Sequence, residues 1–233
     1  QFQAAGHTAV LIIGDYTSRV GDPSGRSSLR PELTEKAIEE NAATFQEQAF
    51  KVLDPELTEV RFNSEWLNMP SAELFALARR FTVARLLERD DFTKRMAAAE
   101  PISLLELLYP VLQGYDSVAV EADLELGGTD QKFNLLFGRD VQGSFGQRPQ
   151  LVLTMPILPG TDGVKKMSKS LGNHIGVTEP ATEIFGKLMS IPDDALGAYW
   201  ELLLGERLDA DRRPMGAKEE LARRICDRFA GPG

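Results

Sequence analysis

The feature that most constrains the fold of this 233-residue chain is a short, continuous apolar run, Ala9-Val10-Leu11-Ile12-Ile13, that ends at Gly14. A run this short and this rich in β-branched residues predicts a buried parallel strand. Further strands are expected at 59–63, at 117–120 and 124–126, and at 151–153, with helical patterns between them. Strands that alternate with helices predict an α/β fold with a Rossmann-type parallel sheet and flanking helices.

Helical periodicity is clear in several stretches. Helices are expected over 31–52, with Phe45 and Phe50 in the core, and over 71–80, 83–87 and 90–99. Another begins after Ser103, where Glu106 completes a capping box. After Val177 only helices are predicted, at 180–190, 194–204 and 217–229. We therefore expect a domain boundary near Thr178, with an α/β domain over 1–178 and a helical segment over 179–233.

Composition excludes several classes of protein. The net charge is −9 and the pI about 4.9, so the chain as a whole does not attract nucleic acid, and any RNA contact needs a local basic patch. One cysteine and two histidines exclude an internal disulfide and make a Cys or His metal site improbable. No apolar run reaches membrane-spanning length, and a cytoplasmic location fits. The chain begins at Gln1 without a methionine, and we expect that it is truncated.

A lysine-rich stretch, Lys165-Lys166-Met167-Ser168-Lys169-Ser170, lies between glycines at 160, 163 and 172. Two lysines three residues apart on a glycine-flanked loop are suited to gripping a polyphosphate while its charge changes. A solvated basic turn is the ordinary alternative.

Polar residues follow each predicted strand. They are Thr17 and Asp22 after the first, Asn63 and Trp66 after the second, and Gly127-Gly128-Thr129-Asp130-Gln131 after the third, with Asp130 expected as a helix N-cap. The carboxyl ends of parallel strands meet at one sheet edge, where ligands bind in open α/β sheets. Each loop alone is equally compatible with a surface turn.

A helix that continues from Ser103 to Asp116 places Tyr109, Gln113 and Asp116 on one face. A phenol, an amide and a carboxylate on an otherwise apolar helix need partners, because buried polar groups are rarely left unpaired. The partners are a bound ligand or neighbouring backbone groups.

Together these motifs resemble the bacterial tyrosyl-tRNA synthetases, which are Rossmann-type class I aminoacyl-tRNA synthetases. The resemblance rests on Lys166-Met167-Ser168-Lys169-Ser170, on Gly21-Asp22-Pro23-Ser24-Gly25, on the Tyr109, Gln113 and Asp116 spacing, and on Gly127 to Gln131. It covers essentially the whole chain.

The resemblance implies a role for each of these residues. Asp22, Tyr109, Gln113, Thr17 and Gln131 would hold the ammonium and carboxylate of tyrosine, and Asp116 would accept its phenol hydroxyl. ATP would contact Asn63, Trp66, Gly128, Asp130, Ile157, Leu158, Met167 and Lys169. Lys166, Lys169 and Ser170 would act on the leaving pyrophosphate, with Arg26 and Arg30 nearby.

The implied reaction is attack of the tyrosine carboxylate on MgATP, followed by transfer of tyrosine to tRNA(Tyr). No protein nucleophile, tightly bound metal or organic cofactor is implied. The family also implies a homodimer through the region from Phe75 to Met96, a soluble cytoplasmic enzyme without membrane contact, and a helical anticodon-binding domain that begins within 179–233.

The chain departs from the family in two respects. It contains no His-x-Gly-His motif, so we expect it to be inactive or nearly so in tyrosine-dependent ATP–pyrophosphate exchange, and it has Glu125 where some relatives have glutamine. Two other functions stay open: a tryptophanyl-tRNA synthetase and a non-catalytic nucleotide- or RNA-binding relative. Gln113 and the Gly127-Gly128 pair favour tyrosine, and the retained Lys166 and Lys169 favour catalysis.

Overall fold

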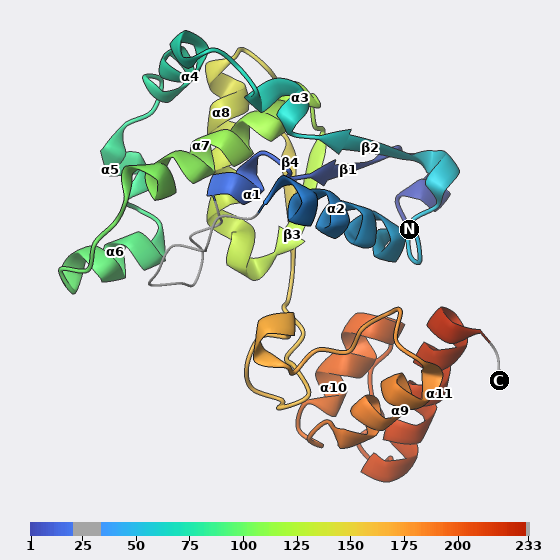
Figure 1. Cartoon of the computed structure of the whole chain (residues 1–233). Helices are drawn as coiled ribbons and strands as arrows, with labels where there is room; N and C mark the ends of the chain where they lie inside the picture. Colours follow the sequence, from blue (N-terminus) through green and yellow to red (C-terminus); the bar gives the residue numbers. More distant parts are fainter. Residues whose placement is uncertain (21–33, 232–233) are drawn as a thin grey trace. The chain divides into compact units, whose positions relative to one another are not determined.

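The computed structural model describes residues 1–20 and 34–231 (Figure 1). The chain forms two compact units, residues 1–155 and residues 156–233. This division falls earlier than the boundary expected near Thr178. The lysine-rich stretch belongs to the second unit, where its Met167 packs against the helical core.

The described residues of the first unit form four strands in two parallel pairs. β1 (Ala9–Ile13) pairs with β2 (Thr58–Phe62), and β3 (Leu124–Gly128) pairs with β4 (Leu151–Met155). The parallel arrangement confirms the α/β prediction. The burial expected for Ala9–Ile13 holds only in part, because Ile13 is 5% exposed but Val10 is 41% exposed. In β4, Leu151 and Leu153 are 61% and 39% exposed. Among the described residues each strand has only one hydrogen-bonded neighbour, so side chains near the outer edges of each pair are left uncovered.

Eight α-helices surround these strands in the described part of the first unit. They are α1 (Thr17–Val20), α2 (Glu35–Ala49), α3 (Ser64–Leu67), α4 (Ser71–Ala78), α5 (Val83–Leu86), α6 (Asp90–Ala97), α7 (Leu104–Ala119) and α8 (Lys132–Ser144). Short 3-10 turns occupy Gln3–Ala5, Pro55–Leu57 and Thr129–Gln131. Two predictions were wrong here. Residues 117–119 end α7 instead of forming a strand, and Phe45 is 52% exposed instead of lying in the core.

Packing of α7 against α8 forms the core of the first unit. Val111 and Val118 of α7 meet Phe137 and Val141 of α8, all at most 8% exposed. The burial of Val118 explains why α7 continues past Asp116, because the helix gains apolar contacts that a strand would give up. The two helices lie side by side in Figure 1.

Gly114 permits this close approach. A Cβ atom at Gly114 would lie 2.6 Å from Cγ2 of Val141, a distance that real structures do not tolerate. Gly114→Ala is therefore expected to lower the free energy of unfolding by about 1–3 kcal/mol, measured by urea denaturation. Gly143→Ala is the control, because a Cβ at this α8 position meets nothing within 4 Å, and it is expected to be neutral or stabilising. Equal effects of the two changes would contradict this account of the packing.

The second unit is helical, as predicted. It contains α9 (Ala181–Ser190), α10 (Leu196–Tyr199), a π-helical turn at Trp200–Leu204, α11 (Pro214–Ala230) and a 3-10 turn at Lys169–Leu171. Ile184, Leu188, Tyr199 and Leu221 are at most 1% exposed and centre its core. Among the described residues of either unit, no helix is both long and apolar enough to cross a membrane.

Candidate functional site

Two strand-end loops of the first unit are tied together by Asn63, which follows β2. Its backbone N–H donates to the carbonyl of Ile13 at the end of β1 (3.0 Å). Its side-chain Oδ1 accepts from the Tyr16 N–H (3.0 Å), and its Nδ2 donates to Thr17 Oγ1 (2.9 Å). Asn63 is fully buried, so these bonds are shielded from water. The loops after β1 and β2 therefore form one polar edge, as predicted for these two strands.

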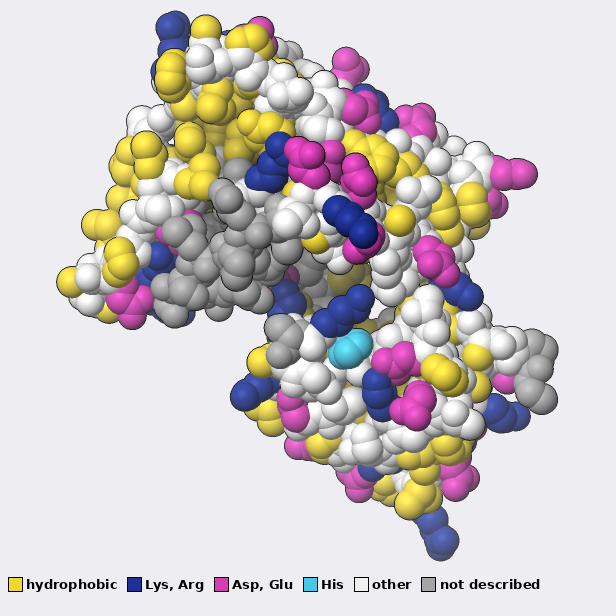
Figure 2. Space-filling model, in the orientation of Figure 1, with side chains coloured by type: hydrophobic (Ala, Val, Ile, Leu, Met, Phe, Trp, Pro, Cys, Tyr) yellow, Lys and Arg dark blue, Asp and Glu magenta, His cyan; other side chains and the backbone are white. Residues whose placement is uncertain are grey.

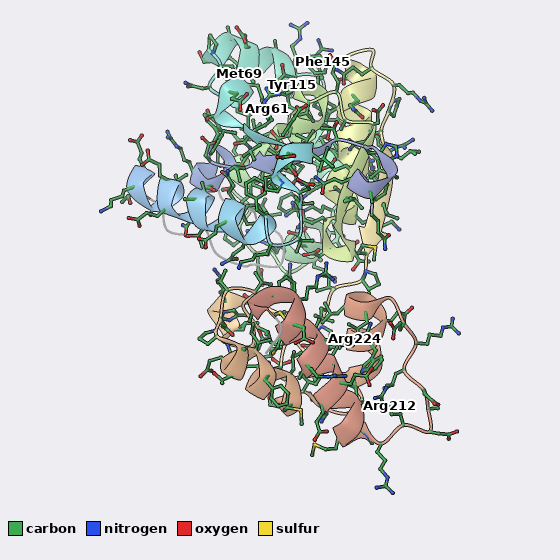
Figure 3. All side chains as sticks on the ribbon, turned by 90° about the vertical axis from the view of Figure 1, so that its right-hand side faces the viewer. Arg61, Met69, Tyr115, Phe145, Arg212 and Arg224 are labelled. Carbon is green, nitrogen blue, oxygen red and sulfur yellow. The ribbon has the colours of Figure 1, made fainter. Side chains whose placement is uncertain are left out.

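Asp116 of α7 faces this edge and is 8% exposed. Trp66 Nε1 donates to its Oδ1 at 2.8 Å, and Asn63 Nδ2 approaches its Oδ2 at 3.4 Å. The guanidinium of Arg61 lies 5.3 Å from the centre of the Trp66 ring, and Figure 3 shows Arg61 on β2. Residues from β2, α3 and α7 thus converge on one buried carboxyl group.

Burial raises the pKa of Asp116 to about 7, because a charged carboxylate is costly to remove from water. The hydrogen bonds from Trp66 and Asn63 oppose this shift, while the nearby carboxylates of Glu125 and Asp15 add to it. A buried acceptor with only neutral donors is poised to take a further hydrogen bond from a ligand hydroxyl.

The polar face predicted for α7 is present. Ser103 and Glu106 form the expected capping box at its start, and the helix runs without a break through Tyr109 and Gln113 to Asp116. Tyr109 and Gln113 are half-buried, and Oε1 of Gln113 is buried without a hydrogen-bond partner among the described residues. An unpaired buried amide oxygen costs free energy unless a ligand donates to it, and an ammonium group is such a donor.

The turn after β3 differs in one detail from the prediction. Residues 129–131 form a 3-10 turn, and α8 begins at Lys132 with Gln131 in the N-cap position, so Asp130 is not the N-cap. The side chain of Gln131 instead accepts from Asn134 Nδ2 at 3.1 Å. Gly127 is required because a Cβ there would lie 2.9 Å from Leu135 Cδ1. This leaves Gly128 half-buried and Asp130 exposed at the strand end.

The lysine-rich stretch of the second unit is a hydrogen-bonded hairpin. Pro159 and Lys166 form an antiparallel bridge, and the Gly160 N–H donates to the Lys165 carbonyl at 2.7 Å. Lys165, Lys166 and Lys169 are exposed, whereas Met167 is half-buried and, with Leu158, packs on the helical core. The methionine therefore fixes the hairpin while the lysines stay accessible to an anion.

Two residues that sequence reasoning missed hold this hairpin in shape. Oδ1 of Asp162 accepts from the N–H groups of Val164 (2.8 Å) and Lys165 (2.7 Å), which lower the pKa of its carboxyl. Asn173, 5% exposed, donates to Asp162 Oδ2 (2.8 Å) and accepts from the Ser168 N–H (2.8 Å). The Asp162-Gly163 pair is a turn signal, but no local pattern marks Asn173.

Asn173→Ala is expected to speed hydrogen exchange of the Ser168 amide about tenfold or more, because it removes the acceptor of that N–H. The Thr161 amide provides an internal control, since it donates to the backbone carbonyl of Asn173, which the change retains. Exchange followed by NMR measures both amides. An unchanged Ser168 rate would contradict the supporting role of Asn173.

The predicted site residues thus fall into two groups, one in each unit. Thr17, Asn63, Trp66 and Asp116 contact one another, while Leu158, Lys166, Met167 and Lys169 belong to the hairpin region. Ile157, just before the hairpin, is half-buried. Asp22, Arg26 and Arg30 lie outside the described residues, as does the side chain of Ser170.

Comparison with known proteins gives consistent matches. A family model described as class I tRNA synthetases (W and Y) matches residues 1–222. Among curated proteins, the tyrosine–tRNA ligase of Oleidesulfovibrio alaskensis is 55% identical over 99% of this chain and 61% of its own length. That of Thermotoga maritima is 57% identical over 94% of this chain and 55% of its own length. The chain thus spans about three fifths of the length of these relatives.

Solved structures support the fold. A tyrosyl-tRNA synthetase from Archaeoglobus fulgidus, complexed with L-tyrosine, superimposes with a TM-score of 0.73 at 22% identity, over 98% of this chain and 80% of that one. A truncated mitochondrial tyrosyl-tRNA synthetase from Aspergillus nidulans gives a TM-score of 0.72 at 22% identity, over 96% of this chain and 72% of that one.

Proposed function

Because the chain belongs to the class I tRNA synthetases of the tryptophan and tyrosine family, we propose that it carries the tyrosine-activating part of a tyrosine–tRNA ligase. The observation that carries this proposal is the buried carboxyl group of Asp116, held by Trp66 and Asn63. The two curated relatives named above are tyrosine–tRNA ligases, which favours tyrosine over tryptophan.

Asp116 gives a physical reason for selecting a phenol. The tyrosine hydroxyl donates to the carboxylate, whereas phenylalanine has no donor and leaves the buried acceptor unpaired. The orphaned Oε1 of Gln113, three residues earlier on α7, is suited to accept from the substrate ammonium. We propose that Thr17, Tyr109, Gln131 and Asp22 complete this part of the pocket.

We propose for Asn63 and Trp66 a role that differs from the expected contact with ATP. Both side chains bond to Asp116, which supports a role in orienting the phenol acceptor rather than in contacting the nucleotide. We propose that ATP instead lies near Gly128 and Asp130 at the end of β3, with Ile157 and Leu158 against the adenine.

The reaction proposed is attack of the tyrosine carboxylate on the α-phosphorus of MgATP, with pyrophosphate as the leaving group. Lys166 and Lys169 stabilise the charge on the leaving phosphates, aided by Ser170. Such stabilisation accelerates the reaction only if it is stronger in the transition state than in the bound substrate. The tyrosyl group then passes to the 3′ end of tRNA(Tyr).

We propose that residues 179–233 begin a helical, tRNA-binding part of the protein, with local basic groups as phosphate contacts. Arg212 and Arg224, labelled in Figure 3, lie over the ring of Trp200 and pair with Glu220 and Glu206. Their charges are thus largely balanced within the unit. Other lysines and arginines are better candidates for binding RNA.

A homodimer in the cytoplasm is also proposed. Phe75 of α4, Val83 of α5 and Met96 of α6 are 68%, 56% and 57% exposed, and hydrophobic side chains gather over α4 and α5 in Figure 2. A large exposed apolar surface of this kind marks an association site. Sedimentation equilibrium of the purified chain tests this, and a monomer at micromolar concentration would contradict it.

Isothermal titration calorimetry with L-tyrosine, L-phenylalanine and L-tryptophan tests the main proposal. Tyrosine is expected to bind the chain at least about tenfold more tightly than phenylalanine, since a hydrogen bond to a charged acceptor contributes about 1.5–3 kcal/mol. Tighter binding of tryptophan would favour the tryptophan enzyme. If the chain binds ATP but none of the three amino acids, a non-catalytic nucleotide-binding protein would be favoured. Pyrophosphate exchange by the 233-residue chain is expected to stay near background.

A further inference from the structure

A second carboxyl group, that of the half-buried Glu125, acts electrostatically on Asp116. Glu125 is the second residue of β3, and its Oε2 accepts from Ser117 Oγ at 3.0 Å and from Gln150 Nε2. Ser117 directly follows Asp116 in α7. The same turn of α7 therefore carries Asp116, the proposed phenol acceptor, and Ser117, which is hydrogen-bonded to Glu125.

Buried polar side chains pack around the half-buried Glu125. Ser117, Gln142 and Gln150 are at most 3% exposed. Gln142 of α8 accepts from the Gln150 N–H at 2.7 Å and donates to the Ser117 carbonyl at 3.2 Å. A Cβ at Gly138 would lie 2.9 Å from both Gln150 Nε2 and Ser117 Oγ, so the α8 backbone closes the cluster. The position of Glu125 relative to α7 is therefore fixed.

The donors to Glu125 are neutral, and no ion pair involves it in the part of the chain that the structure describes. Arg139 of α8 is the cation in this region, and it donates to the Gln150 backbone carbonyl. The charged groups that act on Asp116 are Glu125 and, from the loop after β1, Asp15. Asp15 accepts from the N–H groups of Tyr16 and Ser64. Burial raises the pKa of Glu125 as well as that of Asp116.

We propose that Glu125 is a positioning residue for tyrosine recognition, which anchors the turn of α7 that carries Asp116 and limits, by its negative charge, how far Asp116 is ionised at neutral pH. This inference rests on the proposed function, because it assumes that ionised Asp116 accepts the phenol hydroxyl. Two carboxylates in a poorly solvated environment repel each other, so the charge on one disfavours the charge on the other. Tyrosine affinity must then increase with pH as Asp116 loses its proton.

The test is the pH profile of L-tyrosine binding to the full chain and to Glu125→Gln, measured by calorimetry from about pH 5.5 to about pH 8.5. This range covers the acidic limb of the profile, over which tyrosine affinity rises as Asp116 loses its proton. Glutamine retains an acceptor oxygen for Ser117 and Gln150 but removes the charge. The acidic limb of the profile is expected to move to lower pH by about half a unit, which corresponds to an affinity about threefold higher near pH 6. Glu121→Gln is the control, because Glu121 is exposed in the turn after α7, and its profile is expected to match that of the unchanged chain.

The possible outcomes separate this inference from the proposed function. Weaker binding at every pH with an unmoved limb would assign Glu125 a purely structural role and overturn the inference, while tyrosine binding itself stands. Absence of tyrosine binding by the unchanged chain would overturn the proposed function. The inference about tyrosine recognition would then fall with it. If Glu125→Gln does not fold, carboxyl ¹³C NMR of the unchanged chain tests the charge coupling. Coupled titration of Asp116 and Glu125 is expected, and independent single-step titrations would overturn the inference.

Discussion

Asp116→Asn is expected to weaken L-tyrosine binding at least about tenfold and to reduce the preference for tyrosine over phenylalanine. The amide offers one oxygen where the carboxylate offers two, and its N–H₂ group meets Asn63 Nδ2, which is also a donor. Losing a hydrogen bond to a charged acceptor costs about 1.5–3 kcal/mol, which corresponds to roughly ten- to hundredfold in affinity. Calorimetry with both amino acids measures the change.

The same variant is expected to gain stability, relative to the unchanged chain, at higher pH. In the folded chain the pKa of Asp116 is about 7, above the ordinary value of 3.8, so the folded state keeps a proton that the unfolded state has released. The contribution of Asp116 to the free energy of unfolding therefore decreases as pH rises from about 4 to 7, whereas an asparagine side chain at this position does not titrate. Urea unfolding at about pH 5 and about pH 8, on either side of most of this change, tests the prediction.

Asp123→Asn is the control for both measurements, since Asp123 is an exposed aspartate just before β3. It is expected to leave tyrosine affinity and the pH dependence of stability unchanged. If Asp116→Asn bound tyrosine as tightly as this control, Asp116 would not be the phenol acceptor.

The largest expected loss of stability follows from Glu106→Gln. Arg95 of α6 and Glu106 of α7 form an ion pair at 2.6 Å, with side chains only 8% and 6% exposed. Removing the carboxylate deprives the buried Arg95 charge of its ion-pair partner, a change that costs about 3–5 kcal/mol in other proteins. Urea denaturation at neutral pH measures the loss. Since α7 carries Asp116, the variant is also expected to bind tyrosine more weakly under conditions in which part of the protein is unfolded.

Two further variants test whether the loss of stability comes from the burial of the ion pair rather than from the loss of an ion pair as such. Glu40→Gln breaks the exposed Lys36–Glu40 pair of α2 and is expected to cost less than about 0.5 kcal/mol. Adding Arg95→Met to Glu106→Gln removes the stranded charge and is expected to recover part of the loss. A single-variant cost as small as that of Glu40→Gln would contradict the proposed role of the buried pair.

This ion pair also has a defined pH dependence. Burial alone would raise the pKa of Glu106, but Arg95 and the Ser103 N–H outweigh it and hold the pKa below its usual 4.5. The stability that Glu106 contributes is therefore present above pH 4.5 and is lost as pH falls through the lower folded-state pKa. Glu106→Gln is expected to remove this part of the acid sensitivity.

The local patterns of the sequence predicted much of the fold. The short apolar runs predicted the strands at Ala9–Ile13 and Leu124–Gly128, and the Ser103–Glu106 box predicted the start of α7. Helical spacing placed Tyr109, Gln113 and Asp116 on one face of one helix. These features follow from neighbours within a few residues, so they can be predicted without knowledge of the tertiary structure.

Tertiary packing decided the rest. The end of α7 lies at Ala119 rather than before Ser117, because Val118 packs in the α7–α8 core. The side chains of Asn63 and Trp66 lie on Asp116, 53 and 50 residues away in sequence, a contact that no local pattern encodes. The hydrogen bonds by which Asn173 holds the lysine hairpin, to Ser168 and Asp162, are likewise not marked by any local sequence pattern.

The sequence by itself therefore determined most of the elements, the polar face of α7 and the lysine-rich stretch, because each depends on residue types at short spacing. The tertiary structure decided that Asp116 is buried, that Trp66 and Asn63 are its donors and that Glu125 lies close to it. Burial and charge proximity depend on which distant segments exclude water from the same volume, and only the folded chain brings those segments together.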